Sequence, residues 1–316
     1  MANDTKYPKR KNHSMKRWLF VMLFLMMACE IYAAERVPGT RVSIEPPTGF
    51  EQAKQFPGYV LRDTGSSIMI TEIPAPFLEI SKGFNSRTPQ GMALISKDVV
   101  NIDGYEALLL NVDQNAYGMR FEKWIVVFGN EKETVMITAA FPKGKNELSD
   151  TLKQAVLSAQ WNPNAKVDFF EGLTFKVAEY GGFKIANKVG NNLTLTFGGA
   201  FPVKNEDDPV IVVGALLIDS KMITDRKQFA RKSVYQTATL SNFKILEESD
   251  VRVAALPGRR IIAKAKDTKT GHDRLLYSVY LYNSDECYVF NGIADFSKRE
   301  EYQSIFSSIL NSFSVN

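Results

Sequence analysis

The feature that most constrains the fold of this chain is an internal duplication. Within its 316 residues, a shift of 154 positions places Gly104 on Gly258 and needs no gap for more than 50 positions. The pairs that it matches are apolar or aromatic in both copies: Ile125 with Val279, Val127 with Leu281, Phe128 with Tyr282, Val135 with Val289, Ala140 with Ala294, Leu148 with Tyr302, Leu152 with Phe306 and Val156 with Leu310. A repeat of this length is the size of a whole domain. We therefore predict two tandem homologous domains, 38–161 and 168–316, joined by a polar linker over 162–167.

Both copies end in the same series of predicted elements. Strands at 105–113, 119–129 and 134–141 in the first copy correspond to 259–267, 274–282 and 287–295 in the second, with a Gly-containing hairpin loop at 114–118. A helix follows in each copy. In the first copy it is predicted to begin at about Asn146, and in the second at a capping box formed by Ser297 and Glu300. The second helix carries an apolar stripe at spacings of 3 and 4, formed by Tyr302, Ile305, Phe306, Ile309, Leu310 and Phe313. We expect Phe306 and Leu310 to be fully buried against their sheet.

The front halves of the two copies differ more. Gly49-Phe50 matches Gly182-Phe183 at a shift of only 133, so about 21 residues are inserted in the second copy. Short strands precede a helical candidate at 76–84 in the first copy and a longer amphipathic helix around 225–235 in the second, so the insertion is predicted to enlarge that helix and its loops. Strands in runs, without regular βαβ alternation, predict an α+β fold and not a doubly wound sheet.

This order of elements resembles the PsbP-like superfamily, to which the DcrB-like bacterial envelope proteins also belong. The resemblance is carried by the run at 42–47 (VSIEPP) with Gly49-Phe50, by the run at 68–72 (IMITE), and by the hairpins and final helix of both copies. It implies two domains, each an antiparallel sheet flanked by helices. It also implies a binding or assembly factor without an agreed active site, so no functional residue is carried over.

The first 34 residues are predicted to be an export signal. An apolar block at 18–29 follows Lys16-Arg17 and precedes Ala33 and Ala34, after either of which cleavage is expected. As a helix the block would span about 18 Å, well short of the roughly 30 Å hydrocarbon core of a membrane. Met15 is a possible true start. The expected location is periplasmic or secreted; the alternatives are an uncleaved anchor and a lipoprotein tethered at Cys29, although Met26 stands where a lipidation signal usually has a branched aliphatic residue.

Charge and composition exclude several classes of function. The formal charge of +4 comes from the leader, because 33 basic and 33 acidic residues remain after residue 34. A neutral body lacks the positive field that nucleic-acid binding requires. Only Cys287 and His272 remain of their kinds in this body, which excludes a disulfide framework, a multi-Cys/His zinc site and most thiol–imidazole chemistry. No cofactor is expected.

Each candidate chemical residue also has a structural interpretation. His272 lies at a predicted hairpin tip, where Asp273 is positioned to orient it as a base, but a solvated histidine is the commoner outcome. Cys287 starts a strand next to two acids and is predicted to be an inert thiol. Glu206, Asp207 and Asp208 are the candidate ligands for a hard cation, without the spacing of an EF-hand loop. The paired glycines at 181–182 and 198–199 open no phosphate-binding helix and are predicted to form turns.

The stretch at 71–77 (TEIPAPF) is the candidate for partner contact. Its two prolines stiffen the chain, and Ile73 and Phe77 are the residues proposed to present apolar surface. The alternative is a rigid connection between a strand and a helix, with Phe77 in the core. The sequence thus predicts a non-catalytic envelope protein with paired binding or assembly domains and an unknown protein or small-ligand partner. The alternative function is a carboxylate-dependent hydrolase or small-molecule-binding enzyme of the periplasm.

Overall fold

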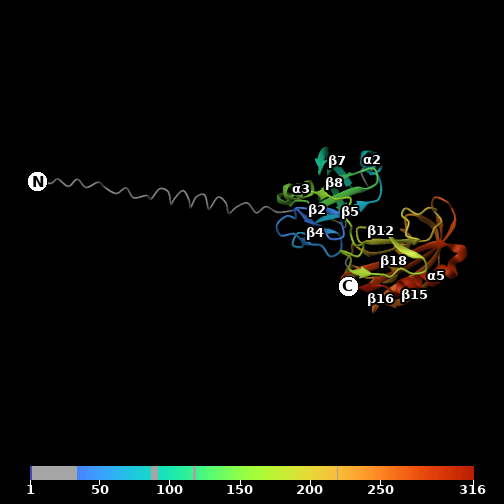
Figure 1. The fold of residues 1–316 in the computed structure, drawn as a ribbon. Coiled ribbons are helices and arrows are strands. Elements are labelled where there is room, and N and C mark those ends of the chain that lie inside the picture. Colours follow the sequence, from blue (N-terminus) through green and yellow to red (C-terminus); the bar gives the residue numbers. More distant parts are fainter. Residues whose placement is uncertain (2–33, 87–91, 117–118, 219) are drawn as a thin grey trace. The chain divides into compact units, whose positions relative to one another are not determined.

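The computed structural model describes Met1 and residues 34–86, 92–116, 119–218 and 220–316. The predicted leader, with Cys29, therefore lies outside the described residues. Residues 34–316 form one compact unit. Its architecture is dominated by two seven-stranded antiparallel sheets (Figure 1).

The two sheets have the same strand order. The first, in spatial order, consists of β3 (Glu51–Gln52), β4 (Gly58–Leu61), β5 (Ser66–Ile73), β9 (Thr134–Pro142), β8 (Met119–Gly129), β7 (Tyr105–Ala116) and β6 (Met92–Ile102). The second consists of β12 (Phe183–Val189), β13 (Asn192–Phe197), β14 (Val210–Leu216), β18 (Cys287–Asp295), β17 (Asp273–Tyr282), β16 (Leu256–Asp267) and β15 (Leu240–Val253). Position for position the topologies agree, which confirms the two sheet-based units that the duplication predicted.

A helix covers each face of each sheet. The first half contributes α2 (Phe77–Ser86) and, after the 3-10 turn η1 (Asn146–Leu148), α3 (Ser149–Leu157). The second contributes α4 (Arg226–Val234), preceded by η2 (Ser220–Met222), and α5 (Arg299–Asn311), preceded by η3 (Phe296–Lys298). The α+β class is confirmed: each half is an antiparallel sheet between helices.

Four apolar clusters correspond to these four helix-covered faces. The α3-side core includes Trp124, Val126, Phe128, Val135, Ile137, Leu152 and Val156, and the α5-side core includes Tyr277, Val279, Tyr288, Phe290, Phe306 and Leu310. The α4-side core has twelve buried members, among them Ala230, Val234, Ile261, Tyr280, Tyr282 and Cys287. The α2-side cluster has only four buried members, Leu110, Val112, Ile125 and Val127. One face of the first sheet is therefore thinly covered.

Two small sheets close the halves. In the first half, β2 (Val42–Ile44) pairs with β1 (Glu35–Arg36) and with β10 (Gln160–Trp161). In the second half, β11 (Phe175–Lys176) pairs with β19 (Ser314–Val315). In each half a strand near the beginning of the segment is thus hydrogen-bonded to the strand that ends it.

The predicted gap-free alignment is wrong in the hairpin strands, by one residue in β8 and β9 and by three in β7, so Gly104 does not correspond to Gly258. Val127 lies in the α2-side cluster, whereas its predicted partner Leu281 lies in the α5-side core, on the opposite face. In β8 and β9 a shift of 153 restores the match, because it places Val126 on Val279. In β7 the shift is 151, because Ala107 pairs with Phe128 as Gly258 pairs with Leu281. A slip of one position reverses the face of every side chain in a strand. The core positions of the terminal helices keep the shift of 154, so one residue is added between the last long strand and these positions.

Two further local expectations are corrected. The insertion does not enlarge the helix, since α4 has nine residues and α2 has ten. The added residues lie mainly in the β12–β13 hairpin and in the loops before β14 and α4. The capping box is also absent: the carboxylate of Asp295 accepts from the backbone N and the Oγ of Ser297, and the N-cap of α5 is Lys298.

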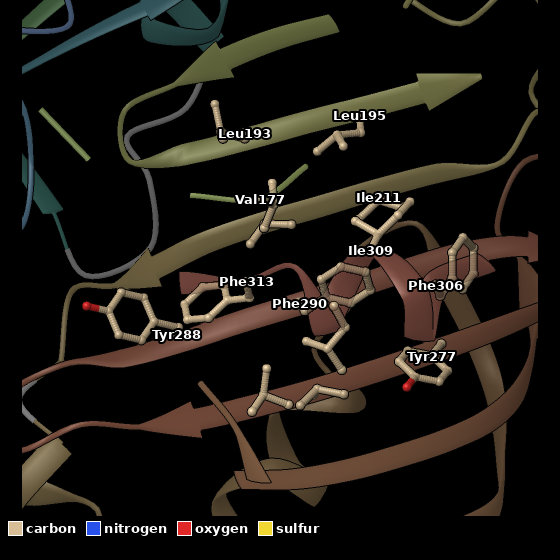
Figure 2. Packing of buried hydrophobic residues seen from close by; sticks show 14 of the residues in the cluster. Val177, Leu193, Leu195, Ile211, Tyr277, Tyr288, Phe290, Phe306, Ile309 and Phe313 are labelled. Atoms are coloured by element: carbon tan, nitrogen blue, oxygen red, sulfur yellow. The ribbon is translucent and has the colours of Figure 1, made fainter. Parts of the chain in front are cut away.

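The terminal helix is packed as its stripe predicted. Phe306 is fully buried and Leu310 is 3% exposed. The ring of Phe306 contacts the rings of Phe183, Tyr277 and Tyr302, and Figure 2 shows Phe306 and Tyr277 among the side chains of this core. Gly292 on β18 makes room for it, because a Cβ there would lie 2.5 Å from the Phe306 ring.

Truncation of Phe306 to Ala should destabilise the second half by about 3–5 kcal/mol, the usual range for a buried aromatic side chain. Thermal or urea unfolding of the purified protein measures this loss. Leu217→Ala, at a position 58% exposed, is the matched control and should shift the midpoint by little. Equal midpoints for the two variants would contradict the packing described here.

Candidate partner-binding surface

The stretch proposed for partner contact connects β5 to α2. Ile73 is the last residue of β5 and pairs with Thr134 of β9. Phe77 begins α2, and its backbone N donates to the carbonyl oxygen of Asn130 at 2.9 Å. The Phe77 side chain is half-buried against the α2-side cluster. The structure thus places Phe77 within the connection, and leaves Ile73 beside a cavity.

That cavity has a volume of about 290 Å³ and is lined by Ile73, Arg41, Glu72 and Glu133, among others. The Arg41 guanidinium donates from Nε to Glu72 at 2.8 Å and from Nη2 to Glu133 at 2.8 Å. Its Nη1 donates to the backbone oxygen of Pro163 at 2.9 Å, which fastens the linker to the first sheet. Burial disfavours the charge on Arg41, but its hydrogen bond to Glu133 and the charges of both carboxylates outweigh this and raise its pKa. One guanidinium against two carboxylates leaves one negative charge in this part of the cavity.

A second cation lines the same cavity. Burial lowers the pKa of Lys188 to about 8, against the opposing attraction of Glu171, Glu72 and Asp168. Its ammonium group donates to the backbone oxygen of Glu171. Lys188 is therefore an anchored structural cation next to three acids.

Breaking the Arg41 network should cost about 2 kcal/mol in Arg41→Gln, less than the 3–5 kcal/mol of a fully buried pair because the site is partly open. The free energy of unfolding in urea measures this cost. Arg62→Gln removes a guanidinium whose ion pair with Glu51 is more than 60% exposed on both sides, and it should change stability by less than about 0.5 kcal/mol. An Arg41 variant as stable as the Arg62 variant would show that the network does not hold the linker.

In the second half, two separate candidate sites, His272 and the acidic cluster, lie in contact. Nδ1 of His272 lies 2.8 Å from Oδ2 of Asp207, whose other oxygen accepts from the buried Arg274 at 2.9 Å. The expected orienting residue, Asp273, instead pairs with Lys264 and Lys266. The side chain of His272 is 63% exposed. A cavity of about 410 Å³ adjoins it, which Ser297 also lines, but the hydroxyl of Ser297 donates to Asp295.

The acidic cluster does not converge on a common point. Glu206 pairs with Lys269, Asp207 with His272 and Arg274, and Asp208 with the amide of Asn205. Among the described residues, no group of three or more His, Cys, Asp or Glu side chains is placed to hold a metal ion. These carboxylates stabilise the loop before β14 and the hairpin that carries His272.

Cys287 starts β18, as predicted, and is fully buried. Burial raises the pKa of its thiol to about 12 from an ordinary value of 9.0. The two neighbouring acids are engaged with other side chains: Asp285 pairs with Lys221, and Glu286 accepts a hydrogen bond from the hydroxyl of Tyr288. Little thiolate is present near neutral pH, so the residue is a packing element of the α4-side core.

In a Cys29→Ser background, Cys287 should resist a thiol reagent such as DTNB at pH 8 in the folded chain and react fully in denaturant, when absorbance counts one thiol. Because folding raises the pKa of this thiol, its contribution to stability is complete below about pH 9 and is lost as the pH rises towards 12. Rapid labelling of the native protein at pH 8 would contradict the burial.

Sequence reasoning missed the apolar edge of the first sheet. Strand β6 is an edge strand of eleven residues, and its side chains Leu94, Ile95 and Val99 are 45%, 55% and 65% exposed. Val99 stands opposite Leu108 and Leu94 opposite Val112, so both lie on the α2 side of the sheet. Ile95 is the extra residue of a bulge between Leu94 and Ser96. Among the residues that the structure describes, the thin α2-side cluster leaves Leu94, Ile95 and Val99 exposed.

The corresponding edge of the second sheet is charged. Strand β15 carries Lys244, Glu247, Glu248, Asp250 and Arg252, and its only large apolar side chain more than one-third exposed is Leu246, at 38%. Charged edge strands prevent unwanted pairing with other chains. The two halves share a topology, but the β6 edge carries two charged residues, Lys97 and Asp98, where the β15 edge carries five. We therefore define the β6 edge, formed by Leu94, Ile95 and Val99, as the candidate partner-binding surface.

Comparison with known proteins agrees with the fold. No family model matches the sequence, and no curated protein does. Among solved structures, LpqN, described as involved in cell envelope biogenesis of Mycobacterium tuberculosis, is 12% identical with a TM-score of 0.35, over 49% of this chain and 86% of its own. Cyanobacterial PsbP from Synechocystis sp. PCC 6803 is 13% identical with a TM-score of 0.30, over 43% and 96%. The solved structures that this chain resembles thus include a PsbP protein.

A third solved structure extends along most of the chain. It is the immunity protein TplEi of the type VI secretion system (T6SS) from Pseudomonas aeruginosa, complexed with "L" peptide, which is 11% identical with a TM-score of 0.30, over 87% of this chain and 95% of its own. These likenesses concern the fold, and the peptide belongs to that protein. Within the described residues, no helix combines the length and apolar character needed to cross a membrane.

Proposed function

We propose that this chain is an exported, non-catalytic envelope protein that binds a partner protein through the β6 edge of its first sheet. The observation that carries the proposal is the exposure of three large apolar side chains on an open edge strand. The corresponding strand of the duplicated half carries five charged residues.

The chemistry of an edge strand specifies the kind of partner. One side of β6 pairs with β7, and its other side offers backbone N–H and C=O groups to a further strand. An extended segment can add to such an edge by main-chain hydrogen bonds, while alternate side chains supply specificity. Leu94 and Val99 favour a partner segment with apolar residues on the α2-side face. The proposed occupant is therefore an extended, partly apolar segment of another protein.

The residues that resemble catalytic groups support a non-enzymatic function. Cys287 is a buried thiol with a raised pKa. His272 is paired with Asp207, and the hydroxyl of Ser297 is turned to Asp295. Asp273 is neutralised by two lysines. The carboxylates near this histidine are thus engaged in structural contacts, which favours binding over hydrolysis.

Val99→Lys should reduce partner binding at least tenfold, because the partner strand would have to bury a charge. A photo-crosslinking amino acid at position 95 measures the effect in cells, as the yield of adducts with and without the Lys substitution. Leu246→Lys is the matched control: the same change on the corresponding edge of the second sheet should leave the yield within twofold. Both variants should keep the thermal midpoint of the parent, because both sites are exposed.

Three outcomes would contradict this proposal. Equal adduct yields from all variants would show that β6 is not the contact. Equal losses from both substitutions would indicate a general effect of added charge. Adducts with the mass of two copies of this chain would identify self-association in place of a separate partner.

A further inference from the structure

A second possible ligand site lies in the second half, beside the first turn of α4. A cavity of about 490 Å³ is enclosed by α4, β15, β16 and the end of β17. Its charged lining residues are Arg226, Lys227, Arg252, Arg259 and Asp250. Four positive charges against one negative charge leave an excess of three, in a chain whose body is formally neutral.

Two of these cations occupy positions that the helix itself disfavours. Arg226 and Lys227 are the first two residues of α4, behind the N-cap Asp225, whose carboxylate accepts from the backbone N of Gln228. The N-terminus of a helix carries a partial positive charge and favours anions. Within the part of the chain that the structure describes, neither side chain forms an ion pair with a carboxylate. A bound anion would offset the unfavourable interaction of both cations with the helix dipole.

Arg226 is held in place without being neutralised. Its guanidinium lies over the ring of Tyr282, with Cζ 4.7 Å from the ring centroid. The hydroxyl of Tyr282 donates to the backbone oxygen of Arg226 at 3.2 Å. Stacking on an aromatic face leaves the in-plane N–H donors of a guanidinium free. The side chain is therefore oriented for recognition of an acceptor in the cavity.

The single acid of the lining is already engaged. Asp250 accepts from Nη1 of Arg259 at 3.0 Å, and Nη2 of Arg259 donates to Glu248 at 2.6 Å. Nη1 of Arg252 donates to the backbone oxygen of Ala255 at 2.8 Å, which orients this side chain. The groups with donors left to offer are therefore Arg226, Lys227 and Arg252. The charge of Arg259 is neutralised by the carboxylates of Asp250 and Glu248.

We propose that this cavity binds the phosphate group of a phosphomonoester or phosphodiester ligand. Two forked guanidinium groups and an ammonium group match the several acceptor oxygens of a tetrahedral oxyanion. The volume exceeds that of inorganic phosphate alone, so an organic substituent has room. The same chemistry recognises a soluble phosphomonoester and the headgroup of an anionic phospholipid.

Binding to the purified exported chain tests this proposal with three probes: inorganic phosphate, glycerol 3-phosphate, and vesicles of phosphatidylglycerol in phosphatidylcholine. Calorimetry serves for the soluble probes and co-sedimentation for the vesicles. We expect saturable binding of at least one probe and at least a tenfold weaker Kd in Arg226→Gln. Lys232→Gln removes the same charge from the same exposed helix outside the cavity, and it should change the Kd less than twofold.

The outcomes separate the sources of the phosphate and can overturn the proposal. Binding of the soluble probes assigns a soluble phosphate ester, whereas binding of vesicles alone assigns a lipid headgroup. No saturable binding of any probe would overturn the site. Unchanged binding in Arg226→Gln, or an equal loss in Lys232→Gln, would do the same. The thermal midpoint of Arg226→Gln should change little, because the loss of stacking on Tyr282 is offset by the removal of a cation from the N-terminus of a helix.

Discussion

The structure depends on central strands that are buried on both faces. In β17 every residue from Arg274 to Tyr282 is buried. Such a strand requires a cover on each side of its sheet, since its alternate side chains point in opposite directions. In the second half α5 and α4 supply the two covers. In the first half α3 supplies one, and α2 covers only a four-residue cluster on the other.

This same constraint explains what the sequence could and could not predict. The terminal helices were placed correctly, because an amphipathic stripe such as Phe306 with Leu310 has one solvent face and one core face. The register of the hairpin strands was off by one or three residues, because a strand buried on both faces has no alternation to mark its orientation. This error did not affect the predicted fold class, because fold class depends on the order of elements and not on the face that a residue occupies.

The candidate surfaces were harder to predict than the fold. Val99 looks like an ordinary strand residue, and its exposure follows from how little of the sheet α2 covers. Asp207 and His272 are 65 positions apart, so neither spacing nor local pattern predicts their contact. Ile73 and Phe77 were proposed as contacts because they are apolar and two prolines lie between them. A stiff connection between a strand and a helix has the same pattern and can direct its apolar side chains into the core. Duplication has thus produced two similar scaffolds whose surfaces differ in chemistry, one with an apolar edge and the other with a cationic cavity.

The small closing sheets affect how each half would respond to mechanical tension along the chain. In the first half Val42, at the start of β2, pairs with Trp161, at the end of β10. In the second half the ladder of β11 with β19 is likewise only two residues long and antiparallel. A pulling force applied at the two ends of either half would therefore meet the hydrogen bonds one after another, as in unzipping, and not all together, as in shear. The seven-stranded sheets would carry load only after these short ladders had opened.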